Sequence, residues 1–337
     1  MDVSDELRAA IRDAGITEDA DLVARILDAG IGMGVDATDR LDLKIASAAV
    51  TEMREAFALF RPFHGVPKVT VFGSARTQPD DPHYQQASRV ASALADRGWM
   101  VVTGAGPGIM QAASEGAGPE KSLGVSIRLP AEQQANEVVT QGGHNVTMKY
   151  FFTRKLMLVK ESSGFICLPG GFGTMDEMFE LLTLQQTGKA EPVPIVLLDD
   201  PGRPFWSGLQ TFVVETLTPA GVISPGDLDR VLITDDITAA VDEITGFWRN
   251  YRSLRWVGQN LVLRLRHEPT ADEVAGLNAA FGDLLAEGSI ELRGPLRAEI
   301  EDDDELDAPR LVLTLNHRRV GELHRLIRAL GSLPSAA

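Results

Sequence analysis

One stretch of the chain decides the fold: Pro169-Gly170-Gly171-Phe172-Gly173-Thr174-Met175-Asp176-Glu177. It follows the apolar run 164–168, which is typical of a buried strand, and it precedes residues 178–186, whose apolar positions have helical spacing. The pattern predicts a strand, a glycine turn and the start of a helix. Backbone N–H groups and the positive end of a helix dipole meet at such a turn, so it suits an anion such as phosphate.

The side chains of this stretch fit a phosphate loop. Gly170, Gly171 and Gly173 permit backbone angles and a close approach that a side chain would block. Thr174 is expected to cap the helix or to hydrogen-bond a phosphate oxygen. Glu177 is expected on the first helical turn, facing the ligand of the loop. The stretch therefore predicts a phosphate loop with a carboxylate beside it.

A pair of cations precedes the loop. Arg154 and Lys155 lie on a helix predicted over 150–161, and they are the natural cations for an anion at the turn. Arginine stays charged at all relevant pH values, so Arg154 is expected to clamp the phosphate or the ribose. Lys155 is expected to assist or to be a surface charge.

Two earlier strands also end in glycine loops. The β-branched run Lys68–Phe72 is followed by Gly73-Ser74, and the run 99–103 is followed by Gly104-Ala105-Gly106-Pro107-Gly108. Each loop alone is a weak signal, and the second matches the dinucleotide fingerprint poorly. Together they indicate one ligand site, because the carboxyl ends of parallel strands share one edge of a sheet.

Strands and helices alternate over residues 63–250, which predicts a Rossmann-like, doubly wound parallel sheet covered on both faces. Further strands of this α/β domain are predicted at 123–130, 145–148, 194–198 and 231–234. Residues 1–62 have amphipathic helical patterns and no recognisable chemistry, so packing or oligomer contacts are expected of them.

Residues 257–337 predict a small α+β domain with two helices on an antiparallel sheet. The expected strands are 260–266, 290–292 and 311–315, and the expected helices are 270–287 and 319–330. Thr270 and Glu273 have the spacing of a capping box. The acidic run Glu299–Asp307 is interpreted as a solvated loop, with a metal site as the less favoured alternative.

Composition limits the partners and the compartment. The chain has 337 residues, a formal net charge of -16 and one cysteine, Cys167. The acidic balance argues against nucleic acid or an anionic membrane as the main partner. Cys167 is expected to be a buried strand residue rather than a nucleophile. A single cysteine and a start, Met1–Glu6, without a signal-peptide pattern lead us to expect a cytoplasmic protein.

The region from Phe152-Thr153-Arg154-Lys155 through Pro169–Glu177 resembles one family, the LONELY GUY (LOG) phosphoribohydrolases. These enzymes release cytokinin bases from their riboside monophosphates, and many members were once labelled lysine decarboxylases. The resemblance extends over about 66–249, and the flanking segments indicate the longer class of the family. It implies a homodimer or a higher homo-oligomer with the pocket near the subunit interface.

The resemblance also assigns residues. It implies that Arg154 and Glu177 are the catalytic pair, and that Gly171, Gly173 and Thr174, with Gly170, bind the substrate phosphate. The remaining pocket candidates, from the resemblance or from their positions, are Ser74, Gly104, Gly106, Gly108, Glu115, Lys155 and Glu180. No metal is expected, because the six histidines show no paired ligand spacing.

The favoured hypothesis is hydrolysis of a nucleoside 5'-monophosphate, preferably a cytokinin riboside 5'-monophosphate, to free base and ribose 5-phosphate, without a cofactor. One alternative is a nucleosidase with broad base tolerance. A second is a nucleotide-binding or carrier module on the same fold, and a third assigns the terminal domains to effector binding. Decarboxylation is rejected, because a pyridoxal enzyme needs a Schiff-base lysine and a partner for the pyridinium nitrogen.

Overall fold

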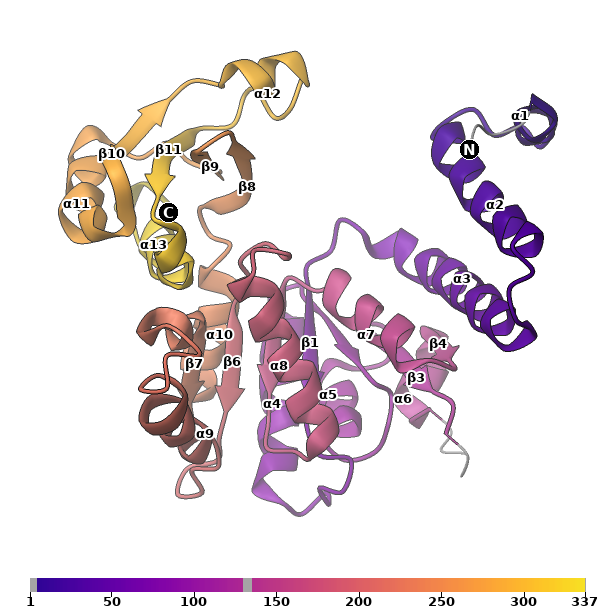
Figure 1. Ribbon diagram of the computed structural model, residues 1–337. Coiled ribbons are helices and arrows are strands. Elements are labelled where there is room, and N and C mark those ends of the chain that lie inside the picture. Colours follow the sequence, from indigo (N-terminus) through magenta and orange to yellow (C-terminus); the bar gives the residue numbers. More distant parts are fainter. Residues whose placement is uncertain (1–4, 130–134, 337) are drawn as a thin grey trace. The chain divides into compact units, whose positions relative to one another are not determined.

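The computed structural model describes residues 5–129 and 135–336. Residues 1–4, in the expected acidic N-terminus, and Pro130, at the end of a predicted strand, lie outside this description. The chain forms two compact units, Met1–Glu55 and Ala56–Ala337 (Figure 1). The second unit contains two separate sheets.

The first unit is helical, as its amphipathic pattern predicts. It contains α1 (Asp5–Asp13), α2 (Ala20–Val35) and most of α3 (Arg40–Phe60), whose last turn belongs to the second unit. Ile11 and Ala24 are buried between these helices, whereas α2 leaves Ile31 and Val35 exposed.

A seven-stranded parallel sheet forms the centre of the second unit and confirms the predicted Rossmann-like α/β class. The strand order is β4-β3-β2-β1-β5-β6-β7. The strands are β1 (Lys68–Phe72), β2 (Met100–Thr103), β3 (Ser122–Ile127), β4 (Asn145–Met148), β5 (Gly164–Cys167), β6 (Ile195–Leu198) and β7 (Val231–Thr234). The chain adds β2, β3 and β4 on one side of β1, and it then adds β5, β6 and β7 on the other side. The carboxyl ends of β1 and β5 therefore flank the switch point where α/β proteins bind ligands.

Helices cover both faces of this sheet. They are α4 (Pro82–Asp96), α5 (Ile109–Ala117), α6 (Glu137–Gly142), α7 (Phe151–Lys160), α8 (Phe172–Gln186), α9 (Trp206–Phe212) and α10 (Ile237–Gly246). Short turns of 3-10 or π-helix lie at Arg61–Phe63, Val213–Leu217 and Pro225–Arg230. One core joins α4, α5 and α10 to strand residues such as Val69 and Ile166. On the other face, the Thr70 hydroxyl donates to the Leu158 carbonyl of α7 at 3.0 Å.

The second sheet is antiparallel, with the order β10-β11-β9-β8. Its strands are β8 (Tyr251–Val257), β9 (Asn260–Leu265), β10 (Leu285–Arg293) and β11 (Arg310–Leu315). Its helices are α11 (Ala271–Phe281), α12 (Arg297–Glu301) and α13 (Leu323–Gly331), with 3-10 turns at Gly282–Leu284, His317–Glu322 and Pro334–Ala336. The α+β character predicted for this region is confirmed.

One predicted element of this region is wrong, and one observed strand was not predicted. The helix expected over 270–287 ends at Phe281, and Leu285 already pairs with β11, because pairing along β10 outweighs local helix propensity. The strand β8 was not expected, because its polar residues do not alternate regularly with apolar ones. It pairs with β9 across a tight turn at Gly258, whose φ of 60° favours glycine.

Polar and charged contacts fix the second sheet region to the first. The Trp248 indole donates to the Ser163 carbonyl at 2.6 Å, and Arg328 of α13 contacts Glu243 of α10 at 2.7 Å. His324 of α13 lies 3.3 Å from the Val193 carbonyl, and burial lowers the pKa of its imidazole to about 3. These contacts make the two sheets parts of one compact unit.

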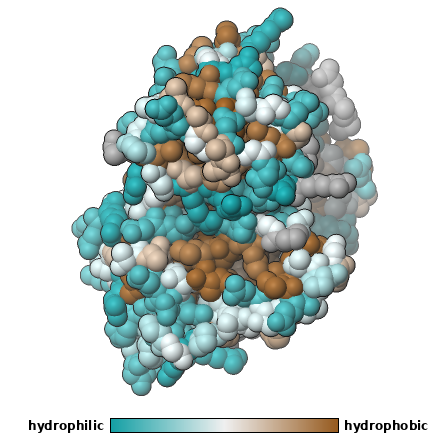
Figure 2. All heavy atoms as spheres, turned by 90° about the vertical axis from the view of Figure 1, so that its left-hand side faces the viewer, coloured by the Kyte–Doolittle hydropathy of each residue, from teal (hydrophilic) through white to brown (hydrophobic). Residues whose placement is uncertain are grey.

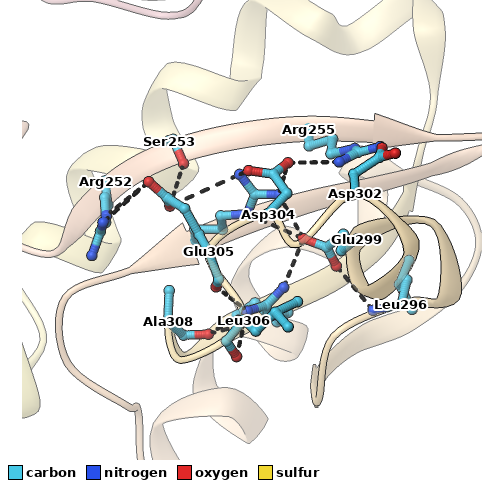
Figure 3. Close-up of polar contacts among 12 residues, drawn as sticks. Arg252, Ser253, Arg255, Leu296, Glu299, Asp302, Asp304, Glu305, Leu306 and Ala308 are labelled. Carbon is cyan, nitrogen blue, oxygen red and sulfur yellow. Dashed lines mark hydrogen bonds and ion pairs between the residues drawn. The ribbon is translucent and has the colours of Figure 1, made fainter.

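The acidic run beside β11 is solvated only in part: Glu301, Asp303 and Asp307 are exposed, whereas Glu299 is buried, so the interpretation is wrong for that part of the run. Figure 3 shows the carboxylates of Glu299, Asp302, Asp304 and Glu305 in polar contacts. Their arginine partners lie on β8, β9 and β11. Glu299 has 0% exposure and lies 2.6 Å from Arg310 and 2.8 Å from Arg264. Asp304 contacts Arg264 at 2.7 Å and Arg255 at 2.6 Å. Four carboxylates of the run, those of Glu299, Asp302, Asp304 and Glu305, therefore form an ion-paired cluster with arginines of the sheet. The described residues contain no group of acidic, histidine or cysteine side chains suited to a metal ion.

Hydrophobic residues gather in a patch on the face drawn in Figure 2, with hydrophilic residues around it. Several apolar side chains near α9 are exposed, among them Phe205, Phe212 and Val222. Within residues 5–129 and 135–336, none of the helices has the length and apolar character needed to cross a membrane.

Candidate active site

A cavity of about 780 Å³ opens at the carboxyl edge of the parallel sheet. The loops after β1, β2 and β5 and the helices α7 and α8 line it, so the two weak glycine loops and the Pro-Gly-Gly stretch meet at one place. The structure brings these sequence-predicted residues together in its lining: Ser74, Gly104, Arg154, Gly170, Gly171, Gly173, Thr174 and Glu177.

The Pro-Gly-Gly loop leads directly into α8. Gly171 is the N-cap residue and no side chain caps the helix, so the expectation that Thr174 caps it is wrong. The N–H groups of the first helical turn have no partner within a helix, and an anion can accept from them. Thr174 is buried against Gly170, where a Cβ atom would lie 2.2 Å from the threonine Oγ1. Glycine at 170 therefore lets the loop close over the helix start.

Arg154 and Glu177 form an ion pair in the cavity wall. Glu177 lies on the second turn of α8, one turn later than expected, because the helix begins at Phe172. Its Oε1 is 3.4 Å from Nη1 of Arg154, and the two residues are 7% and 8% exposed. Nε of Arg154 donates to the Val125 carbonyl of β3 at 2.8 Å, which fixes the guanidinium plane.

Burial sets the electrostatics of this pair. Burial raises the pKa of the Glu177 carboxyl, and the positive charge of Arg154 opposes that rise only in part. Burial lowers the pKa of the Arg154 guanidinium, which Glu177 opposes in turn. A carboxylate of raised pKa beside a fixed cation is suited to accept a proton or to face a developing positive charge.

Glycines make room for this arrangement. A Cβ atom on Gly104 would lie 1.9 Å from Nη2 of Arg154, so the guanidinium occupies the space that a side chain would fill. Gly108 has a φ of 67°, and a Cβ there would lie 2.3 Å from the Ser74 carbonyl oxygen. Gly104 thus positions Arg154, whereas Gly108 allows two loops to pack.

Five sequence-predicted pocket residues do not line the cavity. Lys155 instead contacts Asp176 at 2.9 Å and Glu180 at 2.5 Å. Glu115 accepts hydrogen bonds from Tyr84 at 2.8 Å and from Gln111 at 2.9 Å. Gly106 and Gly108 support the second glycine loop without being part of the lining.

The cavity also contains residues that sequence reasoning missed. Arg76 lies on the loop after β1, and its place directly behind a strand and a Gly-Ser turn was the available signal. Besides apolar residues of β1 and the loop 169–177, the wall contains Met110, Ile127, Leu129 and Phe151. No motif marks these four positions, because apolar residues serve the core and a ligand equally well.

Other candidate chemistries do not fit the side chains. Cys167 is buried on β5, as predicted, and burial raises the pKa of its thiol, so it is not poised as a nucleophile. Lys155 is held by two carboxylates, and Lys160 contacts Glu161 at 2.6 Å. The arrangement offers no free lysine beside the cavity for a pyridoxal Schiff base among the described residues.

Comparisons with known proteins agree on this region. The family model described as "Possible lysine decarboxylase" matches residues 108–244. The cytokinin riboside 5'-monophosphate phosphoribohydrolase of Mycobacterium tuberculosis is 30% identical over 164 residues, 46% of this chain and 81% of that protein. The corresponding enzyme LOG2 of Arabidopsis thaliana is 28% identical over 150 residues, 43% of this chain and 68% of that protein.

A solved structure, the molybdenum cofactor binding protein from Rippkaea orientalis, is 22% identical, covers 53% of this chain and 96% of its own, and has a TM-score of 0.40.

The parallel sheet, with its cavity at the switch point and a glycine loop leading into a helix, defines a Rossmann-like α/β protein. Within this fold class, sequence similarity to the phosphoribohydrolases identifies the family. The chain belongs to the family of cytokinin riboside 5'-monophosphate phosphoribohydrolases, the LOG family.

Proposed function

We propose that this protein hydrolyses the N-glycosidic bond of a nucleoside 5'-monophosphate, releasing the free base and ribose 5-phosphate. The observation that carries the proposal is the buried pair Arg154–Glu177, 3.4 Å apart, in the same cavity as the Gly170–Thr174 loop. The loop supplies donors for a phosphate, and the pair supplies a carboxylate within the same cavity.

The reaction breaks the bond between the anomeric carbon and the base nitrogen. The bonding electrons leave with the base, and positive charge develops on the ribose. The Glu177 carboxylate stabilises that charge and accepts a proton from the attacking water, whose oxygen bonds to the anomeric carbon. Its raised pKa suits both roles. The proton then passes, directly or through water, to the nitrogen of the departing base, so the base leaves neutral and Glu177 is again ionised. Arg154 orients Glu177 and the sugar and remains charged throughout.

The apolar wall formed by Met110, Ile127, Leu129 and Phe151 is suited to an aromatic base. A cytokinin riboside 5'-monophosphate is the favoured substrate, because the relatives from Mycobacterium tuberculosis and Arabidopsis thaliana are named for it. The net charge of -16 supports a small-molecule substrate over nucleic acid. A cytoplasmic location and a homo-oligomeric state remain predictions.

The test is base release from a panel of substrates. The panel contains adenosine and isopentenyladenosine 5'-monophosphates, the guanosine, cytidine and uridine 5'-monophosphates, and the free nucleosides as controls. Preference for the prenylated nucleotide supports cytokinin activation, whereas similar rates on all nucleotides support a broad nucleosidase. Stoichiometric nucleotide binding without turnover of any member contradicts hydrolysis and supports a carrier module.

A further inference from the structure

Four charged residues line the cavity, and they differ in whether each has an oppositely charged partner. Arg154 has Glu177 as its carboxylate partner, and it also donates to the Val125 carbonyl. Asp176 has Lys155, at 2.9 Å. Arg76 is the remaining charged residue of the lining, and across the described parts of the chain its guanidinium has no ion pair.

The backbone places Arg76 beside the Pro-Gly-Gly loop. The Ser74 N–H donates to the Pro169 carbonyl at 3.1 Å, so the loop after β1 touches the loop after β5. The Arg76 N–H donates to the Ser74 hydroxyl at 3.1 Å, and the Arg76 carbonyl accepts from Gln78 at 3.0 Å. The main chain of Arg76 is therefore held in place, while its exposed side chain is free to meet a ligand.

A phosphomonoester brings a charge of about -1.5 to -2 to the cavity at neutral pH. The start of α8 offers partial positive charge and N–H donors, but not a full countercharge. Arg154 is already committed to Glu177, and drawing it to the phosphate would remove it from the pair. Arg76 can provide the missing positive charge without disturbing that pair.

From this charge balance we infer that Arg76 binds the 5'-phosphate of the substrate and sets the preference for nucleoside monophosphates over nucleosides. The inference deepens the proposed hydrolase function and rests on it. It also separates the roles of two arginines: Arg76 recognises the phosphate, whereas Arg154 serves the reacting sugar.

The experiment compares Arg76→Gln, Arg76→Lys and the control Arg97→Gln in the full chain. Arg97 is an exposed arginine after the C-terminus of α4, at the opposite edge of the sheet, so its substitution changes the net charge equally. For Arg76→Gln we expect kcat/KM on the best nucleoside monophosphate to fall by about 10- to 100-fold, mainly through KM. Arg76→Lys should recover part of the loss, and Arg97→Gln should match the wild type.

A second measurement, product inhibition, tests recognition of the phosphate group separately from turnover. Inhibition by ribose 5-phosphate should weaken in Arg76→Gln, whereas ribose, which lacks the phosphate, should act equally on the wild type and the variant. An active wild type with Arg76→Gln indistinguishable from Arg97→Gln in both readouts overturns the inference and leaves the hydrolase function intact.

A wild type inactive on every nucleotide overturns the hydrolase function, and calorimetric binding of adenosine 5'-monophosphate then tests Arg76 directly. Weaker binding by Arg76→Gln than by Arg97→Gln supports phosphate recognition. Equal binding by both variants, or no binding by the wild type, overturns it.

Discussion

Two buried glutamates of this protein show how different surroundings give one residue type opposite properties. Glu299, in the antiparallel domain, accepts from Arg264, from Arg310 and from the Leu296 N–H. Burial alone would raise its pKa, but these donors together lower it. Glu177, in the cavity, has one arginine partner among the described residues, and the pKa of its carboxyl is raised by burial.

The two carboxylates differ in how much of their hydrogen-bonding capacity the protein itself uses. The donors around Glu299 occupy both of its carboxylate oxygens and leave little capacity for a substrate (Figure 3). The contact of Glu177 is long, and the residue faces a cavity of about 780 Å³. Substitution of Glu177 should therefore lower activity, whereas substitution of Glu299 should lower stability.

The largest effect is expected from Glu177→Gln. Removing the carboxylate should lower kcat by about 10³-fold while nucleotide still binds, because the charge acts mainly on the transition state. Rates of base release and calorimetric binding of the nucleotide check this outcome. Glu180→Gln is the matched control, since Glu180 pairs with Lys155 outside the cavity. Normal turnover by Glu177→Gln would remove the glutamate from the mechanism.

Glu299→Gln should change stability rather than chemistry. It leaves the buried Arg310 without its carboxylate partner and removes one of the partners of Arg264, which keeps Asp304, and breaking such a cluster costs about 3–5 kcal/mol. Chemical denaturation should show the loss, while kcat of the folded fraction stays near the wild-type value. Glu301→Gln, which breaks the exposed contact with Arg297, should leave the midpoint unchanged. Equal stability of both variants would show that the cluster contributes little.

Gly104→Ala should have an intermediate effect on activity. The new Cβ would overlap the position of Nη2 of Arg154, so the guanidinium must leave the position from which it contacts Glu177. A displacement of this size lowers kcat/KM by about 10- to 100-fold. Gly208→Ala in α9 is the control, because nothing lies within 4 Å of its added Cβ. An unchanged rate in Gly104→Ala would show that the position of Arg154 is not critical.

The last expected effect is absent at neutral pH and arises only in acid: it is the pH dependence of stability caused by His324. Burial lowers its pKa to about 3, from the ordinary value of 6.5, so the unfolded chain binds this proton more readily than the folded one. The stability is complete above pH 6.5 and is lost as pH falls from 6.5 toward 3, by at most about 1.4 kcal/mol per pH unit. His324→Gln should flatten the unfolding free energy in this window, and an unchanged slope would contradict a neutral buried imidazole.

The parallel sheet and the centre of its site could be predicted from sequence, because local patterns determine them. Apolar runs that end in glycine mark the strands, and the loop 169–177 carries its ligand geometry within nine consecutive residues. Both members of the ion pair could also be predicted from the sequence, since Arg154 and Glu177 belong to one recognisable motif. Their direct contact, by contrast, depends on how α7 packs beside α8, and only the folded chain shows it.

The rest depends on contacts between segments far apart in the chain. Arg76 was missed because no motif marks it, and only the contacts of Arg154 with the Val125 carbonyl and Glu177 show that Arg154 already has partners. The acidic run 299–307 was interpreted as solvated because the sequence does not show its arginine partners, which lie on three different strands. Glu115 was predicted to be a pocket residue because the sequence does not show its partner, Tyr84, which belongs to a separate helix.

The strand order also determines when the protein can first hold its ligand during synthesis. The ribosome releases β1 to β4 first, and at that stage the edge of β1 that later pairs with β5 is uncovered. Half of the cavity is then missing, because α7, the Pro-Gly-Gly loop and α8 are still to come. A nucleotide therefore cannot protect the nascent chain, and the uncovered edge is open to pairing with other chains until β5 is added.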